Sequence, residues 1–271
     1  MTTTSRWIDL DGADNVRDLG GLPTVDGRVV QPHRLIRSDS LQTLSSADVR
    51  YLVDELEVRT VADLRTGVEV DLEGPGPMTR EPAVDIRHLS LFPEAGVHTD
   101  AVAVDDEDDA PVVLPWQTRD RAASREERRR GAPEIYLAYL DDRADSIVGA
   151  LRLIAHSNGA TLVHCAAGKD RTGVVVAMAL AEVGVETDAI VDDYALSAER
   201  AAATIRRLAT RRTYATDLLS DVDIDKHKPQ ALTMERMLAA IDDVHGGVSA
   251  WLRAHGWTEG DAIALRAKLL S

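Results

Sequence analysis

Short apolar runs alternate with amphipathic segments along most of the chain. Residues 58–64 (VRTVADL) are rich in β-branched side chains, which predicts a buried strand, and residues 84–91 alternate apolar and polar positions, which predicts another. Residues 160–164 (ATLVH) form a further apolar run. A small loop and a long apolar segment follow as far as Gly184, which we expect to end a helix in a left-handed conformation. This stretch therefore reads as a strand, a loop and a helix.

Helices are predicted on both sides of this stretch. Ser45 and Asp48 have the spacing of a capping box in front of an amphipathic segment. Pro133 suits the first turn of a helical region whose apolar positions continue to a turn at residues 158–159. Beyond Gly184 the pattern predicts helices alone. They cover residues 189–211, 229–244 and 248–254, and a final helix is capped by Thr258 and Asp261.

The N-terminal region reads as a hairpin. Residues 15–21 (NVRDLGG) crowd polar side chains and two glycines into a turn. Residues 29–30 and 35–36 are short apolar pairs that read as strands, and Pro32 and His33 interrupt the ladder between them.

The pattern breaks down between residues 92 and 131. Residues 105–109 are all acidic, and residues 119–130 contain six arginines among three acids, so this segment is too polar to pack as core. It reads as a surface insertion. Two interpretations stay open, a solvated loop and helix with paired charges or a lid over an active site at about residues 95–131. We therefore predict one domain over residues 1–271, in which the insertion at about residues 95–131 is the candidate lid.

Composition narrows the class of protein. The 271 residues include one cysteine, which excludes an internal disulfide and fits a reducing compartment. A net charge of -15 argues against nucleic-acid binding, because an acidic surface repels phosphates. No run approaches the roughly 18 apolar residues of a membrane helix, and the opening residues MTTTSRW lack the features of a secretory signal. We expect a cytoplasmic protein without an integral membrane segment, and export without a signal peptide stays open.

The candidate chemistry lies in the loop HCAAGKDRT. Five residues separate Cys165 from Arg171, and two alanines and a glycine leave their backbone N–H groups unshielded, so that they can surround an oxyanion at a helix N-terminus. The same field and the guanidinium of Arg171 stabilise a thiolate, so Cys165 is expected to be a nucleophile at neutral pH. The residues expected to bind phosphate are Cys165, Ala166, Ala167, Gly168, Lys169, Asp170 and Arg171.

Two neighbours of this loop are expected to support it. Thr172 can donate a hydrogen bond to the thiolate and make it a better leaving group. His164 is expected to order the loop by hydrogen bonding rather than to transfer protons.

The loop resembles the Cys-x5-Arg-[Ser/Thr] signature of cysteine-dependent protein tyrosine phosphatases. More narrowly, the chain resembles a bacterial subgroup with mycobacterial and listerial members. Four further stretches support this resemblance: NVRDLGG (15–21), RLIRSDSL (34–41), VADLRTGVE (61–69) and GGVSAWLRAHG (246–256).

The resemblance implies an α/β fold, in which helices flank a central, mostly parallel sheet, with a helical lid-like insertion and a helical C-terminal part. It also implies hydrolysis of phosphomonoesters through a phosphocysteine intermediate, with inorganic phosphate as a product ligand. Neither a metal nor a cofactor is expected. Phosphotyrosine is the expected principal substrate, and activity on phosphoserine or phosphothreonine stays open.

A general acid must protonate the leaving group, and the family often supplies it from a Trp-Pro-Asp loop that this sequence lacks. Two candidates remain. Asp170 lies inside the loop, and Glu94 follows a Phe-Pro pair where the resembling proteins have an aspartate. Asp170 could instead anchor the loop, and Glu94 could be a solvated turn residue.

Lys169 bears on the substrate, because a cation inside the loop resembles phosphatases that accept phosphoinositides. It could instead be an exposed lysine that only strengthens the local field. Two other classes of function also stay open. A rhodanese-like sulfurtransferase uses a cysteine in an anion-binding loop but does not require Arg171 and Thr172, and a noncatalytic phosphopeptide-binding module does not require Cys165.

Overall fold

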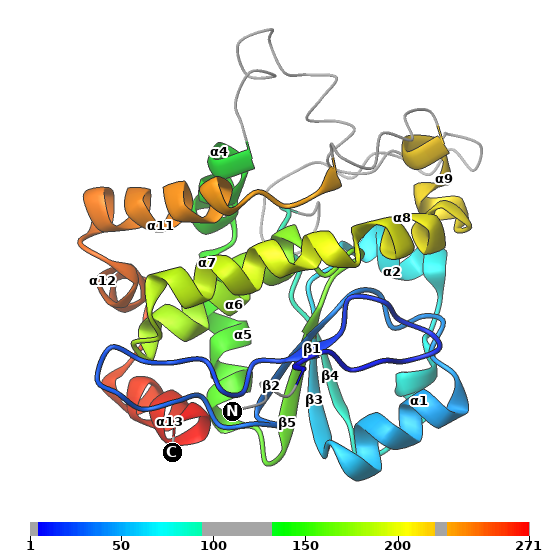
Figure 1. The fold of residues 1–271 in the computed structure, drawn as a ribbon, viewed down its shortest axis with the longest axis horizontal. Coiled ribbons are helices and arrows are strands. Elements are labelled where there is room, and N and C mark those ends of the chain that lie inside the picture. Colours follow the sequence, from blue (N-terminus) through cyan, green and yellow to red (C-terminus); the bar gives the residue numbers. More distant parts are fainter. Residues whose placement is uncertain (1–4, 94–131, 220–226, 271) are drawn as a thin grey trace, which may run out of the picture.

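The computed structural model describes residues 5–93, 132–219 and 227–270 of the chain (Figure 1). In these residues one five-stranded sheet has the order β1-β2-β5-β3-β4. All neighbouring strands are parallel except β1 and β2, which confirms the predicted mostly parallel α/β sheet. The strands are β1 (Arg17–Asp18), β2 (Leu35–Ser38), β3 (Val58–Asp63), β4 (Asp85–His88) and β5 (Ala160–His164).

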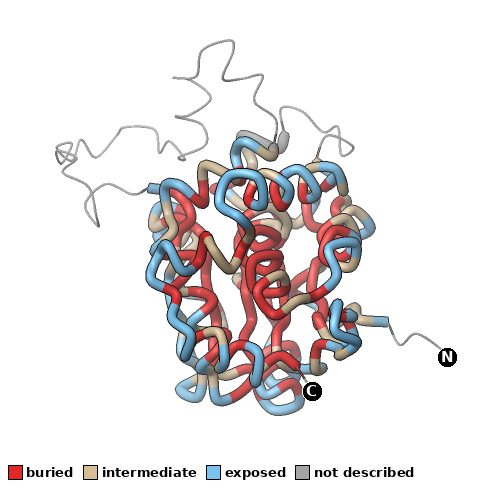
Figure 2. Tube along the Cα trace, turned by 90° about the vertical axis from the view of Figure 1, so that its left-hand side faces the viewer, coloured by how far each residue is buried: buried red, intermediate tan, exposed pale blue. Residues whose placement is uncertain are grey.

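Alternate side chains of the central strands point to opposite faces of the sheet, and each face has its own apolar core. The larger core packs under the helices that follow β4, and the smaller one packs under the helices between β2 and β4. Helices therefore cover both faces, as parallel sheets require, and buried residues run through the interior in Figure 2. Leu35, Ala62 and Val163 face the first core, whereas Ile36, Val61 and Leu162 face the second.

Capping boxes fix the helices around β3. The predicted box at Ser45 and Asp48 is confirmed at the start of α1 (Ser46–Arg50), which continues into a π-helical turn. A second box, of Thr66 and Glu69, starts α2 (Gly67–Glu73) directly after β3. It holds Glu69 at the carboxyl edge of the sheet.

The predicted N-terminal hairpin of residues 29–30 and 35–36 is wrong. The antiparallel partner of β2 is β1, with Arg17 opposite Arg37. Val30 instead forms an isolated bridge with Leu270, so the far end of the chain occupies the position that the hairpin would have used. This pairing depends on residues distant in sequence, which a local pattern does not reveal.

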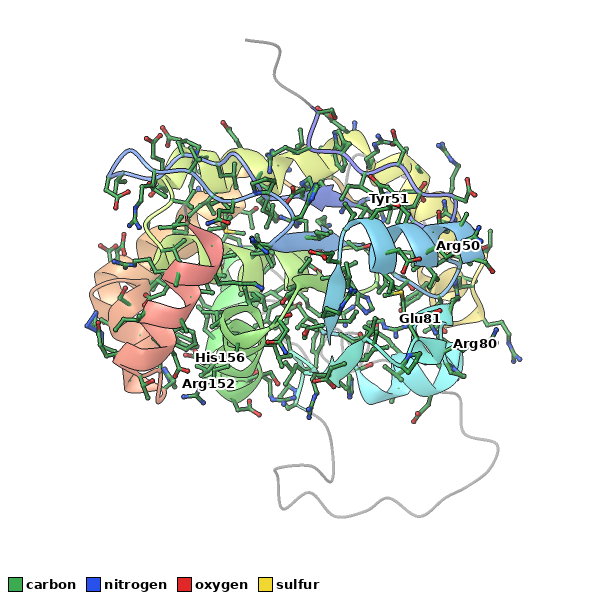
Figure 3. All side chains as sticks on the ribbon, turned by 90° about the horizontal axis from the view of Figure 1, so that it is seen from below. Arg50, Tyr51, Arg80, Glu81, Arg152 and His156 are labelled. Carbon is green, nitrogen blue, oxygen red and sulfur yellow. The ribbon has the colours of Figure 1, made fainter. Side chains whose placement is uncertain are left out.

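The helical region before β5 divides into α4 (Ala132–Asp142) and α5 (Ala144–His156). Arg143 leaves the helical conformation with φ -137° and ψ 44°, and its guanidinium donates hydrogen bonds to the carbonyl of Phe92 and the hydroxyl of Ser146. Arg152 and His156 lie on the outer side of α5 (Figure 3), where both contact Asp261 of the last helix.

The part after β5 is helical, as predicted, but the expected single helix over residues 189–211 is wrong. It divides at a turn of 3₁₀-helix that begins at Ser197, whose hydroxyl accepts a hydrogen bond from buried Arg17 at 3.0 Å. No helix among the described residues is long and apolar enough to span a membrane. The helices are α6 (Asp170–Glu182), α7 (Thr187–Leu196), α8 (Ala201–Ala209), α9 (Arg212–Leu219), α11 (Ala231–His245), α12 (Val248–Ala254) and α13 (Glu259–Leu269).

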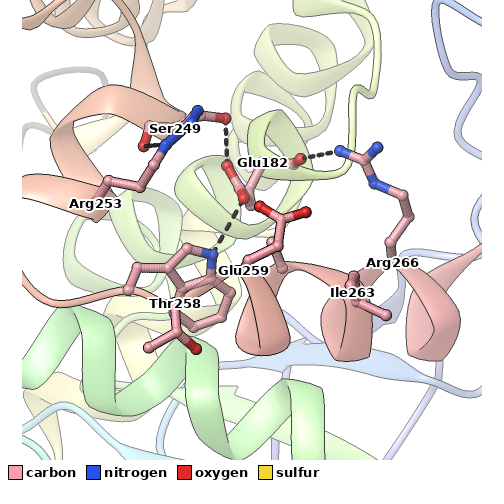
Figure 4. A pocket seen from close by; sticks show the side chains of 9 residues that line it. Glu182, Ser249, Arg253, Thr258, Glu259, Ile263 and Arg266 are labelled. Carbon is pink, nitrogen blue, oxygen red and sulfur yellow. Dashed lines mark hydrogen bonds between the residues drawn. The ribbon is translucent and has the colours of Figure 1, made fainter.

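A buried carboxylate fastens the last two helices to the end of α6. Glu182 accepts hydrogen bonds from the hydroxyl of Ser249 and from Nε1 of Trp257, the latter at 3.1 Å. Arg266 donates to its carbonyl at 3.2 Å, and these groups line a cavity of about 140 Å³ (Figure 4). Gly184, two residues later, has φ +83°, so the predicted left-handed conformation is confirmed.

Candidate active site

The loop of residues 165–169 connects the carboxyl end of β5 to the N-terminus of α6. Gly168 has φ +65°, and a Cβ atom there would lie 2.4 Å from the carbonyl oxygen of Ser38. Only glycine fits this position, because both the conformation and the close approach of β2 exclude a side chain. Cys165 is 2% exposed. The loop is thus packed tightly against the neighbouring strand.

The amide N–H groups of residues 166–169 donate to no acceptor among the described residues. Ala166 and Gly168 are buried, and Ala167 and Lys169 are partly buried. Amides in the interior of a protein are nearly always paired, and an oxyanion would satisfy this run of four, which has no protein acceptor. The N-terminus of α6 adds partial positive charge at the same place.

Arg171 lies on the first turn of α6 and is held by Glu69. Its Nη1 and Nη2 atoms lie 2.6 Å and 2.9 Å from the two carboxylate oxygens, which is a bidentate pair. Glu69 is 0% exposed and also accepts hydrogen bonds from the backbone N–H of Thr66 and the hydroxyl of Tyr214. The guanidinium has five N–H donors, so the pair with Glu69 does not exhaust them.

Both members of this pair are charged near neutral pH. Burial alone would raise the pKa of Glu69, but the adjacent Arg171 and the hydrogen bonds from Thr66 and Tyr214 hold that pKa below its usual value. Burial alone would lower the pKa of Arg171, but the carboxylate of Glu69 raises it well above its usual value. Arg171 is therefore a cation that Glu69 holds in a fixed position beside the loop.

His164 precedes the cysteine and is 2% exposed. Its Nδ1 atom lies 3.2 Å from the carbonyl oxygen of Cys165, so this nitrogen is the donor, and Nε2 lies 3.6 Å from a carboxylate oxygen of Asp63. Burial lowers the pKa of His164, so a neutral ring orders the loop through its hydrogen bond. The hydroxyl of Thr172 is buried and has no hydrogen-bond partner among the described residues.

Asp170 is the first residue of α6, and its carboxylate makes two contacts. One oxygen accepts a hydrogen bond from the hydroxyl of Tyr136 on α4, and the other lies 3.3 Å from Nζ of Lys169. Tyr136 in turn contacts the hydroxyl of Tyr194 at 2.7 Å. These are contacts of a carboxylate that acts as an acceptor and anchors α4 to the loop.

Lys169 and Asp170 open onto a cavity of about 300 Å³. Nζ of Lys169 donates to the carbonyl of His227 at 2.9 Å, and the side chain is 20% exposed. Lys228 and Arg236 line the same cavity. A positively charged recess therefore adjoins the phosphate-binding loop.

Glu94 and the predicted lid at about residues 95–131 lie outside the described residues. Phe92, two residues before Glu94, is described, and its ring centre lies 5.6 Å from the guanidinium carbon of Arg171. Phe92 also packs edge-on against Tyr139 of α4. The chain therefore passes directly over the arginine before it enters the insertion.

Four buried residues behind the loop were not singled out from the sequence. Glu69, Asn15 and Arg37 lie in the stretches that carry the family resemblance, and the TxxE capping pattern at residues 66–69 is the one local signal that could have drawn attention to Glu69. Asp193 lies inside α7 without a local signal. No group of three or more potential metal ligands occurs in the ranges that the structure describes.

The chain is similar to known proteins over much more than the loop. A model described as the tyrosine phosphatase family matches residues 8–271. The chain is 30% identical to the triple specificity protein phosphatase PtpB of Mycobacterium tuberculosis, over 97% of this chain and 98% of that protein. It is 29% identical to a putative tyrosine-protein phosphatase of Cupriavidus necator, over 91% and 82% of the two chains. The similarity covers most of the chain rather than the loop alone.

Proposed function

We propose, from the premise that this chain belongs to the tyrosine phosphatase family, that Cys165 is its nucleophile and Arg171 its main phosphate-binding side chain. The protein is a protein tyrosine phosphatase, which acts on phosphoproteins and releases phosphate. One observation supports this assignment of residues. The same loop brings together Cys165, the amides of residues 166–169 without a protein acceptor, and the Arg171–Glu69 pair.

The proposed reaction has two steps. The thiolate of Cys165 attacks phosphorus in line, an S–P bond forms, and the bond from phosphorus to the leaving oxygen breaks while an acid protonates that oxygen. Water then attacks phosphorus and gives a proton to the conjugate base of that acid, the S–P bond breaks, and phosphate and the thiolate are released. The loop amides and Arg171 stabilise the equatorial oxygens in both steps, and a hydrogen bond from Thr172 stabilises the departing thiolate.

The direct test is release of phosphate from p-nitrophenyl phosphate by the full chain in the presence of a metal chelator, with Cys165→Ser as the control. Release that requires a divalent ion would contradict the thiolate mechanism. Binding without release would favour the phosphopeptide-binding module, and transfer of sulfur from thiosulfate to cyanide would favour the sulfurtransferase.

For the general acid we propose Glu94 and retain Asp170 as the alternative. Phe92 packs over Arg171, so the segment that leads to Glu94 begins beside the phosphate-binding arginine. The carboxylate of Asp170, in contrast, accepts a hydrogen bond from Tyr136 and pairs with Lys169. A carboxylate that accepts two such contacts is better suited to anchoring than to proton donation.

The variants Glu94→Gln and Asp170→Asn are expected to differ. Glu94→Gln should lower kcat for aryl phosphates by about 10²-fold and remove the basic limb of the pH profile, because one proton-transfer group is worth about 10²–10⁴ in rate. Asp170→Asn should retain that limb. The measurement is kcat against pH for both variants with p-nitrophenyl phosphate, and loss of the limb in Asp170→Asn alone would reverse the assignment.

For the substrate we propose phosphotyrosine as the principal group, with phosphoserine, phosphothreonine and phosphoinositides as further substrates. The recess beside the loop, with Lys169, Lys228 and Arg236, supports a substrate that presents more than one negative charge. The name of the mycobacterial relative also records triple specificity. The net charge of -15 supports the absence of nucleic acid among the substrates.

Lys169→Ala is expected to lower kcat/KM for a soluble phosphoinositide headgroup phosphate by about 10-fold and for p-nitrophenyl phosphate by about two-fold or less. The reason is that one partly desolvated ion pair is worth roughly 1–2 kcal/mol. Both substrates are measured side by side at the same ionic strength. Equal losses on the two substrates would remove the argument that Lys169 recognises a second phosphate.

Two further proposals concern the whole protein. We retain a single domain over residues 1–271 with a lid at about 95–131, supported by the passage of the chain over Arg171 at Phe92. The cytoplasm is the proposed location, because the nucleophile is the one cysteine in the chain and must stay reduced. Export from the cytoplasm is the alternative.

A further inference from the structure

The backbone carbonyls of the phosphate-binding loop all accept hydrogen bonds from outside its interior. Two of the donors are backbone amides and the others are side chains. Two of the side-chain donors, Asn15 and Arg37, come from elements far from the loop in sequence, and the third, His164, directly precedes the loop. The contacts are His164 Nδ1 to Cys165 O at 3.2 Å, Ser40 N to Ala166 O at 2.9 Å, Asn15 Nδ2 to Ala167 O at 3.0 Å and Gly168 O at 3.2 Å, Arg37 Nη2 to Gly168 O at 2.8 Å and Lys169 O at 3.4 Å, and Gly173 N to Lys169 O at 2.8 Å.

This arrangement determines where the loop amides point. In a trans peptide the C=O and N–H bonds point in opposite directions. A carbonyl that is held outward therefore directs the N–H of the next residue toward the interior of the loop. The groups that hold the carbonyls of residues 165–169 thus aim the amides of residues 166–170 at the position of a bound oxyanion.

Arg37 contributes the most deeply buried of the side-chain contacts. It lies on β2, is 1% exposed, and uses one guanidinium nitrogen for the loop carbonyls of Gly168 and Lys169. Its other terminal nitrogen donates to a carboxylate oxygen of Asp193 at 2.8 Å. Asp193 lies on α7 and is 0% exposed. The planar guanidinium is therefore fixed at both ends.

Asn15 reaches the same carbonyls from the N-terminal region. Its Oδ1 atom accepts a hydrogen bond from Arg17 at 2.7 Å, which identifies the other end of the amide as the nitrogen that faces the loop. Arg17 also donates to Asp193 at 3.1 Å. One carboxylate thereby fixes both side chains that hold the loop from behind.

The charge of this cluster has the sign that a phosphate site needs. Burial alone would raise the pKa of Asp193, but the three neighbouring guanidiniums hold it below its usual value, so the carboxylate is ionised. Arg17 and Arg37 are both buried against this one carboxylate. Counted with the partly exposed Arg6, three cations pair with this one anion, which leaves excess positive charge behind the loop, where low polarity strengthens its effect on a bound anion.

We infer that Arg37, held by Asp193, is a positioning residue that aims the amides of the phosphate-binding loop, and that Asn15 acts with it. The inference deepens the function proposed above, because it assigns the pre-organisation of that same loop to a cluster that does not touch substrate. Its consequence is that a conservative change behind the loop weakens oxyanion binding and thiolate formation together.

Arg37→Lys tests this inference, because lysine keeps the positive charge but lacks the planar fork that reaches the loop carbonyls. We expect the inhibition constant for orthovanadate to rise about 10-fold or more, since small misplacements of a site can cost about 10²-fold. We also expect the pH midpoint for alkylation of Cys165 by iodoacetamide to move upward by about one pH unit. Loss of stability alone would not move that midpoint.

Arg6→Lys is the matched control. Arg6 donates to the same carboxylate of Asp193 at 2.8 Å and to the carbonyl of Asp18, and it contacts no loop residue among those described. We expect both measured values to stay within about two-fold of the unsubstituted protein. Asn15→Ala is the second test variant, which removes two loop contacts without changing any charge, and it should shift both values in the same direction as Arg37→Lys.

The outcomes separate this inference from the function on which it rests. Failure of orthovanadate to protect Cys165 in the unsubstituted protein would contradict the proposed phosphate-binding loop itself. Unchanged values in folded Arg37→Lys, or in Asn15→Ala if the lysine variant does not fold, would overturn the positioning role. Equal shifts in Arg6→Lys and Arg37→Lys would also overturn it, because the effect would then come from Asp193 and not from the loop contacts.

Discussion

Cys165→Ser is expected to abolish phosphate release from p-nitrophenyl phosphate, with kcat falling by on the order of 10⁴-fold or more. The hydroxyl of serine is almost fully protonated at neutral pH, whereas the loop amides, the end of α6 and Arg171 stabilise the negative charge of a thiolate. The oxygen is also a poorer leaving group in the second step. The measurement is release of p-nitrophenol by the purified variant with a metal chelator present.

The serine variant should remain folded and should still bind substrate, because Cys165 is 2% exposed and the exchange of sulfur for oxygen changes its volume little. Its affinity for a phosphotyrosine peptide, measured by calorimetry, should stay within about ten-fold of that of the unsubstituted protein. Residual activity above about 1% of the parent value would contradict the assignment of Cys165 as the nucleophile.

Arg171→Lys is expected to lower kcat/KM for aryl phosphates by about 10³-fold, the lower end of the range for a single arginine in phosphoryl transfer. Lysine retains the charge but cannot bind Glu69 and two phosphate oxygens at once. The effect should appear in kcat as well as in KM, since the equatorial oxygens gain charge in the transition state. Steady-state kinetics with p-nitrophenyl phosphate separate the two constants.

Stability must be measured in parallel for this variant. Breaking a buried ion pair by removing one partner costs about 3–5 kcal/mol, but lysine keeps one hydrogen bond to Glu69 and the loss should be smaller. Glu69→Gln is the informative comparison, because it leaves Arg171 in place without its fixed partner. A kcat/KM for Arg171→Lys within about 10-fold of the parent, in folded protein, would contradict the role of the guanidinium.

The sequence was most informative where the structural signal is local. The strand, loop and helix around Cys165 follow from an apolar run, small residues and a second apolar run, and the structure contains them as β5, the loop and α6. The capping boxes at Ser45 and Thr258 are likewise set by two residues three positions apart. Such features depend on neighbouring residues and can be read from a single sequence.

The sequence was least informative where pairing joins distant segments. The antiparallel partner of β2 is only two residues long, and Leu270 takes the position at Val30 that a local hairpin would have filled. The break between α4 and α5 follows from the contact of Arg143 with the carbonyl of Phe92, which no helical pattern contains. For the same reason Glu69 and Asp193 were not assigned, since their partners lie 102 and 156 residues away.

The distances along the chain in the cluster behind the loop also bear on how the protein acquires activity. Asp193 lies 176 residues from Arg17 and 156 residues from Arg37. Such distant residues can meet only after the chain between them has been made, and closing a long loop costs more entropy than closing a short one. During synthesis Cys165 is made before Asp193, so the thiol exists before the residue that completes its surroundings. If Arg37 aims the loop amides as inferred above, the surroundings of the thiol are complete only after Asp193 has been made and has packed against Arg37.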